Sequence, residues 1–350
     1  MDRAGRRPRR TGGRGAAQLT PPREVRILAT PVFGAPLSPE VVARIEAVPG
    51  AQVTPISRDG VVHGGADADL EQAEVLLRGA IDATALDHVI ERAPALRWIH
   101  SISAGVDKVA TPLSRQRGLL VTNARGVFSR PIAEYVVMMC LAIARRLPQL
   151  LDLQREQTWQ PLRGSELGSL TVGIVGYGSI GAEVARLLEP FGTRIVATRR
   201  HPELGAGERH NIEVWGTDRL HDILSAADIV VIAAPLTEST AGLIGPAELQ
   251  EMAGHGWLIN IARGRLVDEH ALRSALAAGW IGGAVLDVFD EEPLPPDSPL
   301  YSTPNLVITP HTSWSSDRVL DRSIDLFVAN LERFLADQPL ENRVDLEAGY

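Results

Sequence analysis

Short apolar runs alternate with amphipathic stretches along most of the chain. In the first part, apolar runs of strand length lie at 25–29, 73–78, 96–102 and 118–123, and stretches with helical spacing of apolar residues lie at 38–48 and 83–93. Strands that alternate with helices in this way are typical of an α/β fold with a parallel sheet. The pattern therefore predicts one such unit between Val25 and about Val121.

A second series of the same kind begins at Leu170. Its expected strands are 170–175, 194–198, 228–235, 256–262, 282–289 and 305–310, and its expected helices are 178–191, 217–227, 245–252, 268–279 and 315–337. The helix at 268–279 has typical boundaries, with Asp268 as a candidate N-cap and Gly279 just past its end. The predicted fold class is thus α/β throughout.

The segment between the two series reads SRPIAEYVVMMCLAIARRLPQL, from Ser129 to Leu150. Its apolar stretch runs about four turns and covers nearly all faces of the predicted helix, with Ser129 as a plausible N-cap. A helix that is apolar all round is expected to be buried between domains or between subunits. Cys140 lies inside it and is expected to contribute packing rather than a nucleophile.

Composition narrows the class of protein. The chain has 350 residues, of which 45% are hydrophobic, which is enough for two domains with packed cores. The formal net charge of -8 argues against a nucleic-acid binder. Cys140 is the sole cysteine, so no intramolecular disulfide can form, and we expect a cytoplasmic protein. Lys108 is the sole lysine and no Gly-Lys-Ser/Thr sequence occurs, which excludes a P-loop.

The N-terminal stretch 1–23 is rich in arginine, glycine and proline and contains no apolar segment. We expect it to be a disordered tail, with a weak contact to a polyanion as the alternative. No apolar run in the chain reaches the roughly 18 residues of a transmembrane helix, so we expect no membrane association.

The sequence GIVGYGSIG carries the strongest functional signal. Gly176, Gly178 and Gly181 form a GxGxxG pattern that follows a predicted strand and opens a predicted helix. In that context the first glycine permits a tight turn, the second lets a pyrophosphate approach the backbone, and the third lets helix and strand pack closely. The pattern predicts a dinucleotide site; the alternative is merely a tight turn between strand and helix.

The residue that closes the next strand, RIVAT, is Arg199, and Arg200 follows it. In a dinucleotide-binding unit an acidic residue about 20 positions further on normally binds the ribose hydroxyls. A carboxylate there would repel a 2'-phosphate, whereas a guanidinium pairs with it and contributes about 1.5–3 kcal/mol per contact. We therefore expect NADP(H) to be preferred, with NAD(H) as the second possibility. Ordinary solvated loop arginines are the alternative reading.

Three predicted strands end in side chains suited to acid-base and anion chemistry. Arg263 follows the apolar run of LINIARG, Asp287 and Glu292 lie in VLDVFDEEP, and His311 ends LVITPH. Carboxyl ends of parallel strands lie at one edge of a sheet, where α/β proteins bind ligands. Hydride transfer between a nicotinamide and a 2-oxo acid needs a cation for the carboxylate, a proton donor that titrates near neutrality, and a carboxylate beside that donor. Taken singly, each residue could be an ordinary surface or core residue; their joint placement favours a site.

Seven motifs span nearly all of the chain after the tail. They are SAGVD (103–107), VTNARGVFSRPIAEYVV (121–137), GIVGYGSIG (173–181), APLTEST (234–240), NIARGRLVDEHAL (260–272), AVLDVFDEEPLP (284–295) and NLVITPH (305–311). Together they resemble the D-isomer-specific 2-hydroxyacid dehydrogenases, in the short form without a regulatory domain that is similar to glyoxylate/hydroxypyruvate reductases. The resemblance implies two Rossmann-like, or flavodoxin-like, parallel-sheet domains. A dinucleotide-binding domain of 122–311 would be inserted into a substrate domain of 24–121 and 312–350.

The resemblance also implies roles for individual residues. Arg263 resembles the residue that binds the substrate carboxylate and carbonyl, His311 the general acid/base, and Glu292 its carboxylate partner. The backbone amides of Ala104 and Gly105 resemble a second clamp on the substrate carboxylate. Asp287 resembles a cofactor-side residue near the nicotinamide. The full set implied for cofactor binding is Gly176, Tyr177, Gly178, Ser179, Ile180, Gly181, Arg199, Arg200, Ala234, Pro235, Thr240, Ile261, Ala262, Asp287 and Ser313, and no metal site is implied.

For activity and assembly, the resemblance implies reduction of a small 2-oxo acid to the D-2-hydroxy acid, with glyoxylate or hydroxypyruvate as the default substrate, and a homodimer through the helix 131–147. Arg199 departs from the family's usual acidic residue, which favours NADP(H). Glu292 stands where formate dehydrogenases have glutamine, which argues against that branch. Trp314 stands where small residues are more usual, and it either lines the substrate pocket or packs against the final helix.

Two other functions remain open at the level of sequence. One is a dinucleotide-sensing, corepressor-like binding protein with little turnover, because such proteins use the same fold and can retain the same residues. The other is a reductase for a different acidic substrate.

Overall fold

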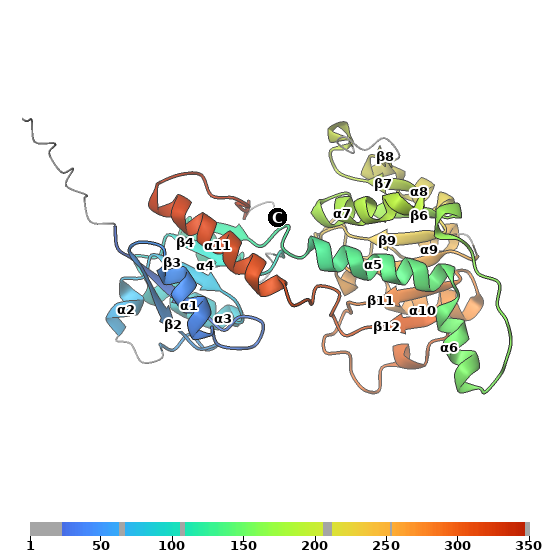
Figure 1. Cartoon of the computed structure of the whole chain (residues 1–350), viewed down its shortest axis with the longest axis horizontal. Helices are drawn as coiled ribbons and strands as arrows, with labels where there is room; N and C mark the ends of the chain where they lie inside the picture. The colour runs from blue at the N-terminus through green and yellow to red at the C-terminus, as the bar shows by residue number, and fades with distance from the viewer. Residues whose placement is uncertain (1–22, 63–66, 106–108, 206–211, 253, 347–350) are drawn as a thin grey trace, which may run out of the picture.

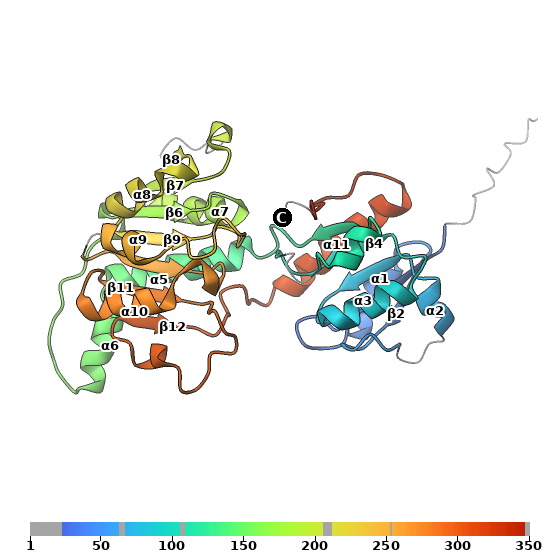
Figure 2. The same cartoon turned by 180° about the vertical axis from the view of Figure 1, so that it is seen from behind.

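The computed structural model describes residues 23–62, 67–105, 109–205, 212–252 and 254–346, which form two β-sheets. Figure 1 shows the two sheets in separate parts of the molecule, and Figure 2 shows the same arrangement from behind. Every strand pair within these sheets is parallel. The predicted fold class, α/β with two parallel-sheet domains, is thereby confirmed.

The first sheet has five strands in the order β2-β1-β3-β4-β5. Its strands are β1 (Val25–Ala29), β2 (Ala51–Pro55), β3 (Val75–Arg78), β4 (Trp98–Ser101) and β5 (Leu120–Asn123). Its helices are α1 (Pro39–Glu46), α2 (Asp67–Glu71), α3 (Ala83–Arg92), α4 (Pro112–Gln116) and, from the far end of the chain, α11 (Val319–Leu335). Phe327 and Phe334 of α11 share a core with Trp98, and the rings of Trp98 and Phe327 stack 5.4 Å apart. Both ends of the chain therefore build one core.

The second sheet has seven strands in the order β12-β11-β10-β9-β6-β7-β8. Its strands are β6 (Thr171–Val175), β7 (Arg194–Thr198), β8 (Ile212–Trp215), β9 (Ile229–Ile232), β10 (Trp257–Asn260), β11 (Gly283–Leu286) and β12 (Leu306–Ile308). Its helices are α5 (Ser129–Ala144), α6 (Leu147–Arg155), α7 (Ser179–Leu188), α8 (Leu220–Ala226), α9 (Pro246–Glu251) and α10 (Glu269–Ala278). Short 3₁₀ helices lie at Leu167–Ser169, Glu189–Phe191, Pro202–Leu204, Thr217–Arg219, Gly264–Leu266 and Pro299–Ser302. Strand β6 lies between β9 and β7, which makes it the topological switch point where α/β sheets bind ligands.

The chain passes between the two parts twice. It leaves the first sheet after β5 and enters α5, and it returns after β12 to form α11. Both passages start at the carboxyl end of a strand, so the carboxyl ends of both sheets lie next to the junction. The C-terminal segment then pairs with the edge of β5, where the amide of Asn123 donates to Asn342 at 3.1 Å and the amide of Val344 donates to Val121 at 2.9 Å. Strand β5 ends at Asn123, the last residue of the strand expected at 118–123.

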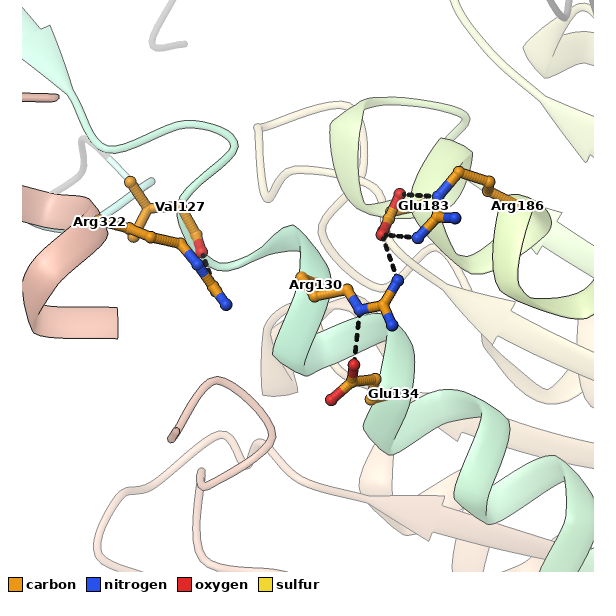
Figure 3. A network of polar contacts seen from close by, with 6 residues as sticks. All are labelled: Val127, Arg130, Glu134, Glu183, Arg186 and Arg322. Carbon is orange, nitrogen blue, oxygen red and sulfur yellow. Dashed lines mark hydrogen bonds and ion pairs between the residues drawn. The ribbon is translucent and has the colours of Figure 1, made fainter. Parts of the chain in front are cut away.

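Arginine side chains hold the first passage from both sides (Figure 3). Nη1 of Arg322, on α11, donates to the carbonyl oxygen of Val127 at 3.3 Å. Arg130, in the first turn of α5, reaches Glu183 of α7 through Nη1 at 3.4 Å. Arg186 donates to both carboxylate oxygens of Glu183 at 2.7 Å, and this bond lowers the pKa of Glu183. The entry into α5 is thus anchored to α11 of the first part and to α7 of the second.

The apolar helix between the two series differs from the prediction in its bounds. Expected at 131–147, it begins at Ser129 and ends at Ala144, after which Arg146 adopts a left-handed φ of 59° and leads into α6. Ser129 is the first helical residue rather than the N-cap, because Phe128 before it already has helical angles of -91° and -7°. Helix α5 packs against α7, which agrees with its apolar character.

Arg23 is the first residue that the structure describes, and it forms an ion pair with Glu74. The rest of the tail expected at 1–23 lies outside the described residues. Among the helices that the structure describes, none is long and apolar enough to cross a bilayer.

His100 is an ionisable residue in the core of the first sheet. It is completely buried on β4, where its Nδ1 lies 2.8 Å from Oγ1 of Thr122, and that same oxygen accepts a 2.8 Å bond from Nε1 of Trp98. No hydrogen-bond partner within the described residues reaches Nε2 of His100. Burial lowers the pKa of His100 to about 3, so the native protein holds this ring neutral.

This buried ring is expected to make the fold sensitive to acid. The unfolded chain takes up a proton at His100 below about pH 6.5, whereas the native state takes it up only near pH 3. As the pH is lowered from about 6.5 to about 3, the free energy of unfolding should therefore fall by about 1.4 kcal/mol per pH unit. Urea unfolding at a series of pH values should show a shallower slope for His100→Gln than for wild type. The exposed His270→Gln serves as the control, and equal slopes in all three proteins would contradict the prediction.

Candidate active site

His311 and Glu292 form a contact pair beyond the ends of β12 and β11. Nδ1 of His311 lies 2.7 Å from Oε2 of Glu292, and Oε1 of Glu292 accepts a 3.0 Å bond from the amide of Phe289. Because a carboxylate only accepts hydrogen bonds, Nδ1 carries the hydrogen and Nε2 faces away from the pair. The two side chains are 42% and 36% exposed, so a ligand can reach the ring. The arrangement can hold and deliver a proton at Nε2.

The loop that carries His311 is tied to Asp287. The carboxylate of Asp287 accepts bonds from Thr309, Thr312 and Ser313 at 2.6–2.9 Å. Asp287 is completely buried and Ser313 nearly so. Both are among the residues expected to bind the cofactor. Ser313 belongs to the loop of His311, and Asp287 binds that loop through its carboxylate.

Arg263 follows β10 in a loop that is folded by a buried asparagine. Asn260 donates to the carbonyl oxygen of Arg263 at 2.9 Å and accepts from the amide of Ala262 at 3.1 Å, and Nη1 of Arg263 donates to the carbonyl of Ala262 at 2.8 Å. A Cβ atom on Gly264 would lie 1.9 Å from the carbonyl carbon of Phe289. Only glycine fits there, so the loop of Arg263 rests directly on the loop that holds Glu292.

The expected substrate clamp follows β4 in the other sheet. Asn123 donates to the carbonyl oxygen of Ala104 at 2.8 Å, and the amide of Ala124 donates to that of Ser103 at 3.1 Å. In a planar trans peptide the N–H points opposite to the C=O, so the amides of Ala104 and Gly105 point away from these partners. Within the described residues neither amide has an acceptor. Val106 and Asp107, which complete the SAGVD motif, lie outside the described residues.

The glycine turn after β6 fits a dinucleotide pyrophosphate. Gly176 has a φ of 105°, and a Cβ atom on it would lie 2.5 Å from the amide nitrogen of Ala234. A Cβ on Gly181 would lie 2.6 Å from the carbonyl oxygen of Gly176, so helix and strand meet closely there. No atom lies within 4 Å of a Cβ on Gly178, which leaves open space at the N-terminus of α7. The first amides of a helix lack intrahelical acceptors, and this space is where a phosphate can meet them.

The other residues expected to bind the cofactor lie in or near the turns at this edge of the sheet. Tyr177 is buried, and its amide donates to Thr198 at 2.7 Å. Ser179 and Ile180 form the first turn of α7. Thr240 donates to the carbonyl oxygen of Pro235 at 2.8 Å and so closes the loop after β9. Ala234 and Pro235 follow β9, and Ile261 and Ala262 follow β10, both at the same sheet edge as the glycine turn.

Arg199 and Arg200 follow β7, next to the glycine turn. The carbonyl oxygen of Thr198, at the end of β7, accepts the amides of Gly176 and Tyr177, so the two turns touch. Arg199 is half-buried and its Nη1 donates to the carbonyl oxygen of Gly205 at 3.1 Å, whereas Arg200 is exposed. The structure therefore places two arginines directly after the strand next to the glycine turn, where the sequence predicts a contact to the cofactor ribose.

Sequence reasoning missed three polar residues that fold the loops of the site, of which Asn123 and Asn260 are buried and Thr309 is partly buried. Asn123, Asn260 and Thr309 were not singled out, although each sits where an apolar strand ends. A polar residue that closes an apolar strand is the signal that could have identified them. Among the described residues, no three His, Cys, Asp or Glu side chains gather as a group that could hold a metal ion.

Trp314 was left between two roles by the sequence. Its ring stacks on Phe33 at 5.1 Å and meets Phe128 edge-on at 6.2 Å. The contacts thus join the second passage to the first passage and to the loop after β1.

Comparison with known proteins places this fold and site in a family. Residues 137–313 match the family described as "D-isomer specific 2-hydroxyacid dehydrogenase, NAD binding domain". A glyoxylate reductase of Thermofilum pendens is 36% identical over 309 residues, which cover 83% of this chain and 89% of that protein. A D-isomer specific 2-hydroxyacid dehydrogenase of Xanthobacter autotrophicus, solved with NADPH and MES, superposes with a TM-score of 0.81 at 29% identity over 93% of this chain and 100% of that one.

An NADPH-dependent glyoxylate/hydroxypyruvate reductase of Sinorhizobium meliloti, solved with NADP and sulfate, has a TM-score of 0.78 at 28% identity. The superposition covers 93% of this chain and 99% of that reductase. The superpositions thus span both sheets, and the residues matched by the family, 137–313, contain the glycine turn, Glu292 and His311. The chain belongs to the family of D-isomer specific 2-hydroxyacid dehydrogenases.

Proposed function

We propose that the chain reduces a small 2-oxo acid to the D-2-hydroxy acid with NAD(P)H, and that NADPH is the preferred cofactor. The observation that carries the reaction is the 2.7 Å pair of His311 and Glu292 beside the loop of Arg263. Glyoxylate or hydroxypyruvate is the proposed substrate class, which agrees with the activities named for the relatives from Thermofilum pendens and Sinorhizobium meliloti.

In this proposal the glycine turn and the first amides of α7 hold the cofactor pyrophosphate. The reduced nicotinamide, when bound, supplies a hydride to C2 of the substrate. Arg263 binds the substrate carboxylate from one side, and the amides of Ala104 and Gly105 bind it from the other. Both contacts orient the carbonyl group and keep its oxygen within reach of the imidazole.

His311 supplies the proton that completes the reduction. Its Nε2–H bonds to the carbonyl oxygen and transfers a proton as that oxygen gains negative charge. Glu292 holds Nδ1–H throughout, so it fixes the ring plane and stabilises the imidazolium before transfer. A dinucleotide-sensing protein with little turnover would need neither a proton donor nor a carboxylate that orients it. The intact pair of His311 and Glu292 therefore argues against that alternative.

Arg199 and Arg200 support the preference for NADPH. At neutral pH a 2'-phosphate carries up to two negative charges, which a guanidinium attracts and a carboxylate repels. The 3.1 Å bond to Gly205 holds Arg199 beside the turn and leaves its other N–H groups for a phosphate. Solved relatives from Xanthobacter autotrophicus and Sinorhizobium meliloti contain NADPH or NADP.

The apolar surface of α5 and α6 supports a homodimer as the assembly. Met138, Leu147, Leu150 and Leu151 are 39–51% exposed on these neighbouring helices. Exposed apolar patches can mark interaction sites, and a second copy of the chain is the occupant that the family resemblance favours.

Replacing His311 with Asn should lower kcat for 2-oxo acid reduction by roughly 10²–10⁴, because it removes the general acid. The dissociation constant for NADPH, measured by fluorescence titration, should stay within about twofold. His255→Asn is a matched control, since His255 also pairs with a carboxylate, Asp228, at 2.8 Å, but at the opposite edge of the sheet. Turnover by His311→Asn near that of the control would refute the assigned role.

Replacing Arg199 with Asp should reverse or remove the preference for NADPH over NADH, because a carboxylate repels the 2'-phosphate. Added salt should weaken NADPH binding more than NADH binding, since the phosphate contact is partly exposed and screened. Arg194→Asp, at the start of the same strand, is the control. KM values for both cofactors at low and high ionic strength test this. A wild type that uses NADH at least as well as NADPH would show that the two arginines are ordinary loop residues.

Replacing Leu150 with Glu should shift the protein from dimer to monomer in sedimentation velocity, because the charge would be buried in the proposed interface. Val61→Glu is a control of similar exposure on the first part of the molecule. A wild-type protein that sediments as a monomer at micromolar concentration would contradict the assembly.

A further inference from the structure

A partly buried series of hydrogen bonds runs beneath the loop of His311. Oη of Tyr135, on α5, lies 2.7 Å from Oγ1 of Thr309, and Oγ1 of Thr309 donates to Oδ1 of Asp287 at 2.6 Å. Tyr135 is 9% exposed and Asp287 is not exposed at all. Thr309, between them, is partly exposed. The hydrogen bonds therefore link α5 to the ends of β12 and β11.

Asp287 also accepts three backbone amides of the loop. Its Oδ1 also accepts the amide of Thr312 at 2.9 Å, its Oδ2 accepts the amide of Ser313 at 2.9 Å, and its backbone carbonyl accepts the amide of His311 at 2.8 Å. One residue thus fixes the main chain on both sides of the imidazole. Buried hydrogen bonds to an ionised carboxylate are stronger than those between neutral groups.

The main chain at His311 needs such an anchor. Its φ of 49° lies in the left-handed region, which a non-glycine residue adopts at a cost of about 1–3 kcal/mol and only when its surroundings enforce it. Without the anchor the loop would relax, and the ring would leave the position set by Glu292.

The direction of the bonds makes Tyr135 the outermost donor. The carboxylate of Asp287 only accepts, so the single hydrogen of the Thr309 hydroxyl is directed to it. Thr309 can then only accept from Tyr135, which must keep its proton. Burial raises the pKa of Tyr135 to about 12, so the phenol stays protonated at neutral pH.

We propose that Tyr135 and Thr309 are positioning residues for His311, which act by holding Asp287 and, through it, the strained loop of the acid/base residue. The proposal rests on the proposed function for its effect on turnover, but the anchoring of the loop stands on its own geometry. Misplacement of a reacting group by about 1 Å can cost about 10²-fold in rate, so a small relaxation of this loop is enough to matter.

The test compares Thr309→Val, which has nearly the same shape but no hydroxyl, with Thr309→Ser, which keeps the hydroxyl. Thr309→Val leaves Tyr135 without an acceptor and Asp287 without one donor, and kcat should fall about 10- to 100-fold. KM for the 2-oxo acid should change less than kcat, and the dissociation constant for NADPH should stay within about twofold. Thr309→Ser should restore kcat to within about threefold of wild type. Tyr135→Phe should cost about two- to tenfold.

Hydrogen–deuterium exchange of the cofactor-free protein, read by mass spectrometry, provides a readout that does not depend on turnover. Peptides that cover 309–316 should exchange faster in Thr309→Val and in Tyr135→Phe than in wild type and in Thr309→Ser. Thr303→Val and Tyr301→Phe, whose hydroxyls lie outside this chain of bonds, are the matched controls. Should Thr309→Val fail to fold, Tyr135→Phe carries both measurements.

Two outcomes would overturn the proposal. One is unchanged exchange at 309–316 in Thr309→Val and in Tyr135→Phe. The other is a loss of kcat that Thr309→Ser does not restore. A wild-type protein that reduces no 2-oxo acid would instead refute the proposed function, and the exchange measurement would still decide whether the loop is anchored as described.

Discussion

The candidate site depends on the parallel register of β10, β11 and β12. In that register Asn260 lies opposite Leu286, and Leu286 lies opposite Ile308, so the three strands end in one row. Short, fixed lengths of chain lead from this row to Arg263 and to His311. Side chains alternate between the two faces of a sheet along each strand. A slip of one residue in the pairing would therefore turn the side chains of the slipped strand to the opposite face. The backbone hydrogen bonds of the sheet therefore set the distances between the groups that act on a substrate.

Buried polar side chains at the ends of β5, β10 and β11 hold the loops that follow these strands in fixed positions. Asn260 binds both ends of the loop of Arg263, Asp287 binds the loop of His311, and Asn123 binds the loop of Ala104. A buried polar group without a partner costs about 1–3 kcal/mol, so each of these residues is stable only when its loop is folded around it. The hydrogen bonds that satisfy each buried residue therefore also fix the loop residue that faces the substrate in the proposed site.

Much of this was predictable from the chain. The apolar runs placed most strands, Asp268 does cap α10 through a 2.9 Å bond to the amide of Ala271, and Gly279 does end it at a φ of 69°. The short edge strands β2 and β8 were missed, because their apolar runs are too brief to stand out. The link between Tyr135 and Thr309 joins residues 174 positions apart, and only the strand order and the docking of α5 bring them together. Sequence reports which residues end the strands, whereas tertiary packing decides which ends meet.

In the proposed site the two sheets supply different halves, so their relative placement is part of the proposal. Ala104 follows a strand of the first sheet and Arg263 a strand of the second, and a carboxylate is held from both sides only if the two loops face each other. Aromatic rings occupy both passages of the chain: Phe128 in the first meets Trp314 in the second, and Phe33 stacks on Trp314. Phe33 does so with a φ of 49°, which is unfavourable for a bulky residue unless its surroundings enforce it. The stacked rings at the junction therefore help to fix how the proposed clamp of one sheet faces the proposed acid/base group of the other.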